Sequence, residues 1–335
     1  MKKLFTCLIF ITLNFFLVNS LIQAQDIHFS QFDIAGQTYN PATSGAIKDD
    51  FRFTSHYKDQ WRSIGTPYKT GFASCDFKTR PKKSSKNSLG LGVSFYNDRA
   101  GTAKLGTSMA SLSLSYHIHL NQENSLGAGI QNGFGQRSIH LEGLKWDNQF
   151  DGDTYDPSRN PNENMQANNI VFFDLSGGLF WNYIEDDYIK INAGISGSHL
   201  NAPRQSFYEN ADRTFPKILI HGGAEIPWEN TNTTILPAFM IIKQGPFQEI
   251  NAGGMIKYIL GTDSKYTGLR TSSAFYIGSF FRYGDAIAMV TRFDFKNSLS
   301  IGFSYDINVS RLRLASSGRG GMEISLVYRG VFDRK

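Results

Sequence analysis

Cysteine is nearly absent from this chain, which has only Cys7 and Cys75. Cys7 lies in an apolar stretch near the start and lacks the neighbours of a lipid-modified cysteine. If that stretch is removed on export, Cys75 is left alone, and a single cysteine cannot form an internal disulfide. The sequence therefore excludes a disulfide-stabilised scaffold and argues against a lipoprotein anchor.

Long apolar runs are missing after the first 24 residues. No later stretch approaches the roughly 18 consecutive apolar residues of a spanning helix, and the mean hydropathy of -0.29 is too polar for a helical membrane protein. A strong charge of one sign is also missing, because the formal net charge is only +5. We therefore expect no membrane helices in the mature chain and no binding of nucleic acid.

Familiar catalytic motifs are absent as well. The sequence has no Gly-x-Ser-x-Gly, His-Glu-x-x-His or Cys-x-x-Cys pattern. His117 and His119 share one parity with Ser111, Ser113 and Ser115, which could suit a hydrolase inside a barrel. The simpler interpretation is a pair of lumen-facing or interfacial histidines near the end of a strand. We therefore predict neither an enzyme nor a bound cofactor or metal ion.

The first 24 residues predict a secretory signal peptide. Lys2 and Lys3 form a charged start, residues 4–18 form an apolar core with polar interruptions, and Ala24 ends a small-residue stretch. A membrane anchor helix is the alternative, but the interruptions and the cleavage-like end favour removal. We expect export and cleavage after Ala24, which leaves residues 25–335 as the mature chain.

The chain is rich in long alternating stretches. Over residues 107–120, small polar residues occupy one parity and mostly apolar residues the other, and residues 298–309 repeat this pattern. Side chains of a strand point alternately to opposite faces, and fourteen residues is about twice the usual strand length. Such strands suit a transmembrane β-barrel with lipid outside and water inside, as do an aromatic content of 14% and 32 glycines. A soluble all-β domain is the alternative.

The whole chain predicts about 14 such strands. They are expected at residues 51–58, 68–78, 88–97, 107–120, 125–138, 170–184, 188–200, 216–228, 232–243, 248–260, 271–283, 286–296, 298–309 and 321–331. An even number places both termini on the periplasmic side, with short turns there and longer loops outside. The connections after strands four, six, eight and twelve are short, and those after five, seven and thirteen are long. Those after two, nine, ten and eleven break the rule. We predict an all-β fold, one antiparallel barrel over residues 51–335.

Residues 25–50 do not fit the strand rhythm. A disordered leader is one interpretation, but this segment is too apolar for one. It could project into the periplasm or enter the lumen, and we favour a plug. The residues expected to form the plug are Phe29, Gln31, Tyr39, Asn40 and Pro41.

The 139–169 connection is long and acidic, and loops of this length are usually functional or disordered. Its carboxylates are Asp147, Asp151, Asp153, Asp156 and Glu163. Clustered oxygen ligands could hold calcium, yet their spacing lacks a calcium-loop pattern. A solvated acidic loop is the expected structure.

Charged residues also fall at positions that face the lumen. They are Lys190, Lys257, Arg282, Arg292, Asp294 and Lys296. We expect them to pair across the lumen or close it. Alternatively, they could set the selectivity of an open pore.

Several motifs carry a family resemblance. Residues 25–31, 39–45 and 57–61 resemble the opening of the PorP/SprF family of outer-membrane proteins. Further matches lie at 97–101, 146–150, 198–203, 244–245, 304–306, 310–312 and 320–326. Departures from the family pattern are Gln37-Thr38, where a more apolar run is usual, and Met322, where His is common.

The resemblance implies an integral outer-membrane protein of type IX secretion, and in gliding bacteria a role in motility and adhesin display. One branch is linked to periplasmic ring lipoproteins of the secretion machine. Another acts with a giant secreted adhesin, and its barrel serves cargo with a type B C-terminal domain. We therefore expect an export or surface-anchoring partner of a secreted protein, held in outer-membrane lipid. A plugged passive or selective pore is the alternative, and a barrel enzyme comes third.

The contact surface is expected on the outer loops, because aromatic residues are enriched at interface hot spots. The candidate residues are Trp61, Trp146, Asp147, Tyr155 and Phe207. Of these, Trp61, Tyr155 and Phe207 are expected to be exposed. Trp61 could instead belong to an aromatic girdle or to the lumen.

Overall fold

A computed structural model describes residues 26–79, 87–142, 144–160, 162, 167–185, 189–208, 213–261, 272–311 and 313–332. The expected signal peptide and Glu163 of the acidic loop lie outside these residues. Within them, no helix is both long enough and apolar enough to cross a membrane.

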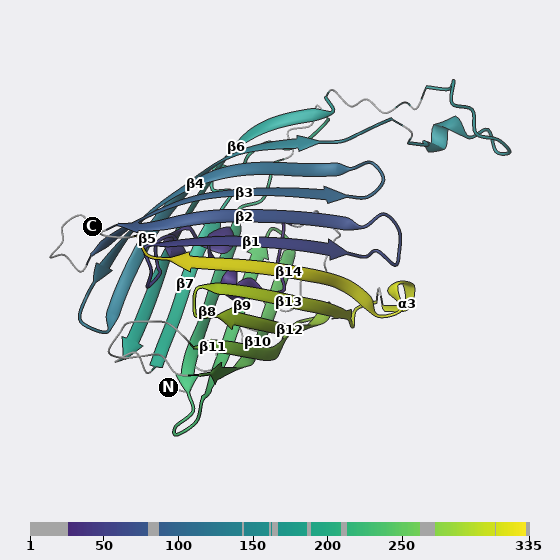
Figure 1. Cartoon of the computed structure of the whole chain (residues 1–335). Helices are drawn as coiled ribbons and strands as arrows, with labels where there is room; N and C mark the ends of the chain where they lie inside the picture. Colours follow the sequence, from purple (N-terminus) through teal and green to yellow (C-terminus); the bar gives the residue numbers. More distant parts are fainter. Residues whose placement is uncertain are drawn as a thin grey trace, which may run out of the picture.

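Fourteen antiparallel strands form one closed barrel (Figure 1). The barrel closes where β1 pairs with β14, from Phe51 opposite Gly330 to Gln60 opposite Gly321. The prediction of a 14-stranded antiparallel barrel is confirmed, and the predicted strand ends differ from the observed ones by only a few residues. The strands are β1 (Phe51–Gln60), β2 (Tyr68–Thr79), β3 (Ser88–Ala100), β4 (Leu105–His119), β5 (Asn124–Ser138), β6 (Asn169–Glu185), β7 (Ile189–Ser198), β8 (Lys217–Pro227), β9 (Thr233–Gln244), β10 (Phe247–Leu260), β11 (Ser273–Arg282), β12 (Ala286–Phe295), β13 (Leu299–Asn308) and β14 (Arg319–Gly330).

Alternation along each strand separates the two faces of the wall. In β4, Ser111, Ser113 and Ser115 are buried, whereas Leu112 and Leu114 are exposed on the outside. Period-two side-chain placement therefore gives the barrel a polar inner face and an apolar outer face, as the sequence predicts.

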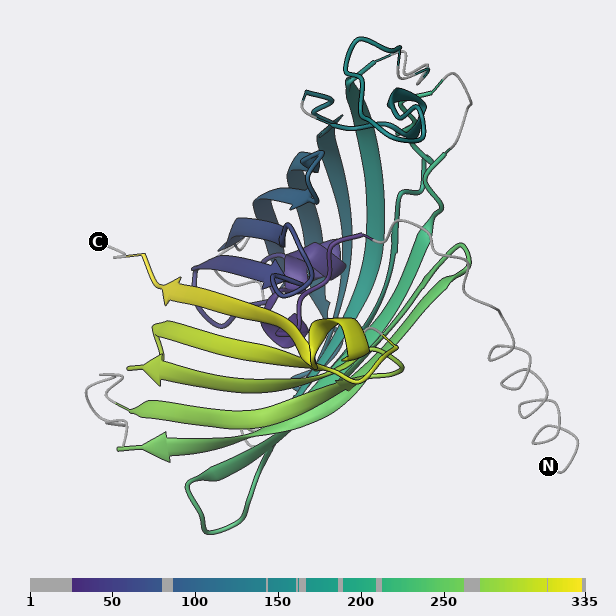
Figure 2. The ribbon, with the colours of Figure 1, turned by 90° about the vertical axis from the view of Figure 1, so that its right-hand side faces the viewer.

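The two ends of the barrel differ. Connections that follow odd-numbered strands lie at one end, here named the loop end, which carries the long β5–β6 connection and the short helix α3 (Arg313–Ser316) (Figure 1). The other end, named the turn end, carries the start of β1 and the end of β14. Strand heights are also uneven, and Figure 2 shows β6 in teal extending beyond the end of β7 at the loop end.

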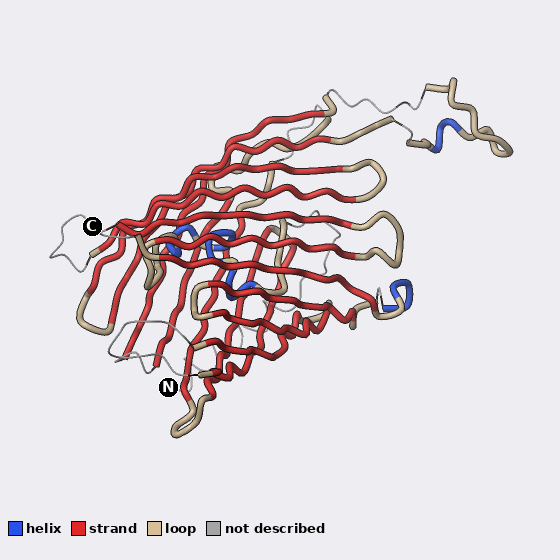
Figure 3. Tube along the Cα trace, viewed as in Figure 1, coloured by secondary structure: helices blue, strands red, loops and turns tan. Residues whose placement is uncertain are grey.

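A segment before β1 lies inside the barrel, and residues 26–45 are here named the lumen segment. It contains three short helices, η1 (Phe32–Ile34), α2 (Gly36–Tyr39) and η2 (Pro41–Thr43), which Figure 3 shows in blue behind the red strands. Its apolar residues pack with inward side chains of β2, β8–β12 and others, so the apolar core lies between this segment and the wall.

Candidate functional site

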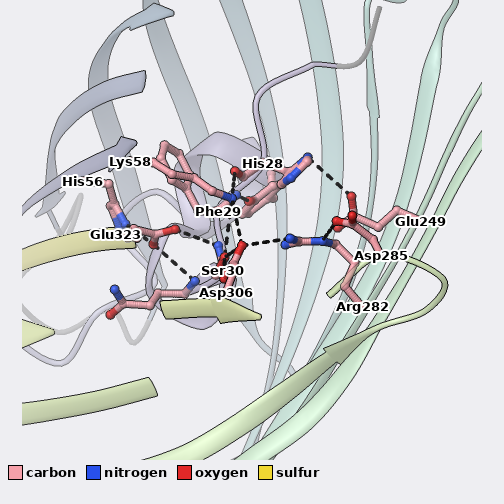
Figure 4. A network of polar contacts seen from close by, with 12 residues as sticks. His28, Phe29, Ser30, His56, Lys58, Glu249, Arg282, Asp285, Asp306 and Glu323 are labelled. Atoms are coloured by element: carbon pink, nitrogen blue, oxygen red, sulfur yellow. Dashed lines mark hydrogen bonds and ion pairs between the residues drawn. The ribbon is translucent and has the colours of Figure 1, made fainter. Parts of the chain in front are cut away.

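The lumen segment is fixed to the wall by buried polar contacts, and this contact zone is the candidate site. At its centre, the carboxylate of Glu323 on β14 accepts two backbone hydrogen bonds (Figure 4). The Ser30 amide donates at 2.8 Å and the Gln31 amide at 3.2 Å. In addition, Ser325 Oγ donates to Gln31 Oε1 at 2.7 Å. Charged acceptors make strong hydrogen bonds, so Glu323 holds this part of the chain in one register.

Asp306 on β13 extends this contact zone to other strands. It accepts a hydrogen bond from Ser30 Oγ at 2.7 Å and lies 2.9 Å from the guanidinium of Arg282. Lys58 of β1 lies 3.8 Å from the same carboxylate and donates to the His28 carbonyl at 3.0 Å. Since burying an unpaired charge is costly, these opposite charges stabilise one another inside the wall.

A second anchor lies at the loop end. Asp26 Oδ2 is 2.7 Å from both His199 Nε2 and Lys217 Nζ. The other ring nitrogen of His199 is 2.6 Å from Asp174 of β6. Burial lowers the pKa of His199, but the two carboxylates outweigh it and raise the pKa to about 9. His199 is therefore a cation at neutral pH and joins the start of the lumen segment to the β7–β8 connection.

A third anchor involves the helical part of the lumen segment. Asp33 Oδ2 lies 2.6 Å from the guanidinium of Arg292 on β12. Beside it, the ring of Phe32 meets the ring of Phe280 edge-on at 4.9 Å between centroids. A charge pair and an aromatic pair thus fix η1 against β11 and β12.

Asn40 and the turn that follows it pack against glycines of the wall. Asn40 Nδ2 donates to the carbonyl of Leu179 at 2.9 Å, and its Oδ1 accepts from the Ala42 amide. A Cβ on Gly129 of β5 would lie 2.5 Å from the backbone nitrogen of Ala42. The glycine is therefore required by this close approach of two backbones.

The turn-end part of the lumen segment is held by other strands. The Ser44 carbonyl accepts from Ser115 Oγ at 2.6 Å and lies 2.9 Å from His117 Nε2. The Gly45 amide donates to Asp76 at 2.8 Å, and Asp76 also pairs with Arg52. Ser115 and His117 thus position the lumen segment. The sequence had offered these two residues as candidates for a hydrolase site.

The structure brings all five expected plug residues into the lumen. Phe29, Gln31, Tyr39, Asn40 and Pro41 are buried there. Most of the expected lumen charges also have inward partners, since Arg282 pairs with Asp306, Arg292 with Asp33, and Asp294 accepts from Tyr276. Lys190 pairs with Glu225, and Lys257 lies over the Tyr276 ring. Lys296 was assigned wrongly, because β12 ends at Phe295 and Lys296 is exposed in the following turn.

The five expected contact residues are spread over three connections and form no single cluster. Trp61 follows β1 and packs edge-on against Tyr68 at 4.8 Å. Trp146 and Asp147 lie in the β5–β6 connection, as does Tyr155, whose hydroxyl donates to Gln149 at 3.2 Å.

The expectation that Trp61, Tyr155 and Phe207 are exposed is wrong for Phe207, and the other two are half-buried. Phe207 is only 9% exposed, and Arg137 of β5 lies over its ring. Phe150, which is not among the five expected contact residues, is the most accessible aromatic of the β5–β6 connection and is 50% exposed.

Two carboxylates of the acidic loop accept hydrogen bonds from within the loop. Asp151 accepts from the amides of Asp153 and Thr154, and Asp156 accepts from Ser158. These hydrogen bonds lower the pKa of Asp151 and Asp156. Within the described residues, no three His, Cys, Asp or Glu side chains are grouped to hold a metal ion.

The sequence motifs and the barrel fold agree with the family that the chain matches. Residues 21–328 match the family described as "Type IX secretion system membrane protein PorP/SprF". The chain belongs to the PorP/SprF family. It is therefore an outer-membrane β-barrel of type IX secretion, and family and fold point to secretion or transport rather than to an enzyme. Because bacterial barrels place their longer loops outside, we expect the loop end to face the cell exterior.

Solved barrels resemble this PorP/SprF protein at low identity. The CymD monoaromatic hydrocarbon channel has 12% identity and a TM-score of 0.49, with 93% of this chain and 95% of that chain covered. The P. putida toluene transporter TodX has 10% sequence identity and a TM-score of 0.48, with 88% of this chain and 93% of that chain covered. BamA from Haemophilus ducreyi lacking POTRA domains 1-3 has 9% identity and a TM-score of 0.43, with 84% of this chain and 70% of that chain covered. We found no match among curated proteins.

Sequence reasoning missed the wall residues that fix the lumen segment in this PorP/SprF protein. The main ones are Lys58, Asp306 and Glu323, and His199 of the β7–β8 connection was missed as well. Lys58 and Glu323 face each other on the paired strands β1 and β14. Opposite charges at lumen-facing positions of the first and last strands could have predicted the contact zone at Lys58 and Glu323 from the sequence.

Proposed function

We propose that this barrel is an export or cell-surface anchoring partner of a secreted type IX protein that carries a type B C-terminal domain. In this proposal, the lumen segment is a plug, and the loop end supplies the docking surface. Family membership supports the link to secretion, and the buried lumen segment supports a role for the outer surface instead of the lumen.

The anchoring of the lumen segment is the observation that carries the proposal. Its first described residue, Asp26, is bound at the loop end, and Gly45 is bound to Asp76 near the turn end. Between them, Ser30 and Asn40 are buried against opposite parts of the wall. A chain held at several depths leaves little free path for a solute, so the accessible surface for a large partner is the set of outer connections.

The docking surface is proposed to include half-buried and exposed aromatic groups, together with acidic groups, of the outer connections. Trp61, Trp146, Asp147 and Tyr155 remain candidates, and Phe150 joins them because its ring is accessible. Aromatic side chains offer a large contact area at low cost in conformational entropy, which suits them as anchors for a protein partner.

Deleting the gene for this chain tests the proposal in cells. We expect one or a few secreted proteins with a type B C-terminal domain to disappear from the cell surface, while unrelated outer-membrane proteins keep their levels. Surface proteomics measures both. Normal surface levels of all such proteins would contradict the proposal. Affinity purification of the tagged barrel then identifies the partner, and recovery of periplasmic ring lipoproteins alone would indicate a core component of the secretion machine.

Conductance of the purified barrel tests the plug and the pore alternative together. We expect low conductance for the intact chain in planar bilayers and a rise when residues 26–45 are deleted. A matched control keeps the segment and deletes the exposed helix α3. High conductance with the segment in place would favour a passive or selective pore.

A further inference from the structure

Strand β6 extends beyond its neighbour at the loop end. It has 17 residues and β7 has 10, and their pairing begins only at Gly177 opposite Gly197. A tilted transmembrane strand needs about 9–11 residues to cross the hydrocarbon layer. Counted from the turn end, the crossing part is used up near Leu175, so residues 169–173 stand at the outer surface (Figure 2).

The backbone groups of this overhang have a defined direction. Leu175 donates to Asn201 Oδ1 at 3.1 Å, and its carbonyl accepts from the Leu200 amide at 2.9 Å. The Phe173 carbonyl accepts from Asn201 Nδ2 at 2.7 Å. In an antiparallel strand, every second residue directs both backbone groups to the same side. Val171 and Asn169 therefore direct theirs away from β5, toward the space beyond the end of β7.

These groups form an unprotected strand edge among the described residues. No hydrogen bond from a described residue reaches the Phe173 amide or either backbone group of Val171 on that side. Protein edges are usually blunted by a charge or a proline, yet residues 169–173 read Asn-Ile-Val-Phe-Phe. The outward side chains of Val171 and Phe173 are 55% and 52% exposed.

We propose that this edge, residues 169–173, accepts an extended segment of the secreted partner as an added β-strand. This inference rests on the proposed function and gives it a binding mode. Main-chain hydrogen bonds to an exposed edge supply affinity, and alternate side chains supply specificity. The added strand would carry β-branched or aromatic side chains beside Val171 and Phe173.

The neighbouring charges define the partner further. The β5–β6 connection, which leads into β6, presents exposed carboxylates, including Asp147, Asp151 and Asp153, and the β7–β8 connection presents the exposed cations Arg204 and Arg213. The partner segment is therefore expected to carry Lys or Arg on the side of the β5–β6 connection and Asp or Glu on the side of the β7–β8 connection. A second copy of this chain fits less well, because edge-to-edge pairing would bring two acidic connections together.

The test uses the full-length tagged chain, expressed in its own cells and purified from outer membranes with whatever it retains. Val171→Pro removes the free amide and is compatible with an edge strand. Val171→Thr keeps both the amide and the branched Cβ and is the matched control. We expect Val171→Pro to reduce the recovered secreted protein about tenfold, the size of effect that losing one or two hydrogen bonds produces, and Val171→Thr to retain it.

Amide exchange on the wild-type complex provides a measurement that needs no variant. The Val171 and Phe173 amides should exchange slowly in the complex and rapidly in the same chain after the partner is removed. Unchanged recovery with Val171→Pro or rapid exchange in the complex would each overturn the inference while leaving the proposed function intact. If the wild type retains no secreted protein, or retains only a second copy of this chain, both fail.

Discussion

The imidazole of His199 lies 2.7 Å from the carboxylate of Asp26, which places the start of the lumen segment in contact with an outer connection. Asp26 also binds Lys217, the first residue of β8. One residue of the lumen segment therefore contacts the chain on both sides of the β7–β8 connection.

This contact should weaken at alkaline pH. Burial lowers the pKa of His199, but Asp26 and Asp174 raise it to about 9, against 6.5 for a free histidine. The stabilisation from the charged imidazole is complete below pH 6.5 and is lost as the pH rises through 9. Protection of the residue 26–30 amides, taken as the exchange rate of an unstructured peptide at the same pH divided by the observed rate, should fall over this range. His199→Gln should remove this pH dependence of protection, whereas equal protection at pH 6.5 and 9.5 in the wild type would contradict the assignment.

Glu323→Gln should loosen the centre of the lumen segment. The carboxylate receives the Ser30 and Gln31 amides on two oxygens, and a glutamine offers only one acceptor. A lost hydrogen bond to a charged group costs about 1.5–3 kcal/mol. The exchange rate of the two amides should rise about tenfold or more.

Glu225→Gln is the matched control for that substitution. Glu225 pairs with Lys190 in a partly exposed position, and such pairs contribute little. If Glu225→Gln and Glu323→Gln changed the exchange of Ser30 equally, the anchoring role of Glu323 would be refuted.

Gly129→Ala should displace the turn after Asn40. The added methyl would lie 2.5 Å from the Ala42 nitrogen, and overpacking of this kind costs about 1–3 kcal/mol. We expect a lower free energy of unfolding in urea and faster proteolysis of the lumen segment. Gly71→Ala on β2 is the control, since no atom lies within 4 Å of its added methyl. Equal stability of the two variants would argue against a tight fit.

Phe150 and Phe207 should respond differently to alanine. Phe150 is exposed, so Phe150→Ala should lower the amount of secreted protein that copurifies and leave unfolding unchanged. Phe207 is covered by Arg137, so Phe207→Ala should increase proteolysis of the β7–β8 connection. Quantitative pull-down and limited proteolysis distinguish these outcomes. A stability loss in Phe150→Ala would place that ring in the loop core.

The strands could be predicted because lipid and water impose a simple rule on every one of them. In β4, every outward position from Leu112 to Ile118 carries an apolar side chain. The burial of Phe29 and Tyr39 was anticipated for a related reason, since apolar side chains before the first strand need cover. Periodicity carries this information locally, residue by residue.

The contacts of the lumen segment could not be predicted in that way. Ser30 and Glu323 are 293 positions apart, and nothing near either residue specifies the other. Phe207 was misjudged because its cover comes from Arg137, on a different part of the wall. The overhang of β6 depends on where β7 ends, which is a property of two strands together. Contacts between residues far apart in the chain are therefore the part of the structure that could not be predicted from this sequence alone.

The buried charge cluster has a consequence for assembly. Lys58, Asp306 and Glu323 belong to the first strand and the last two, which must meet for the sheet to close. All three bind residues 28–31, so the N-terminal chain connects the strands on both sides of the closing seam. The contacts that fill the lumen therefore also contribute to the free energy of closing the wall.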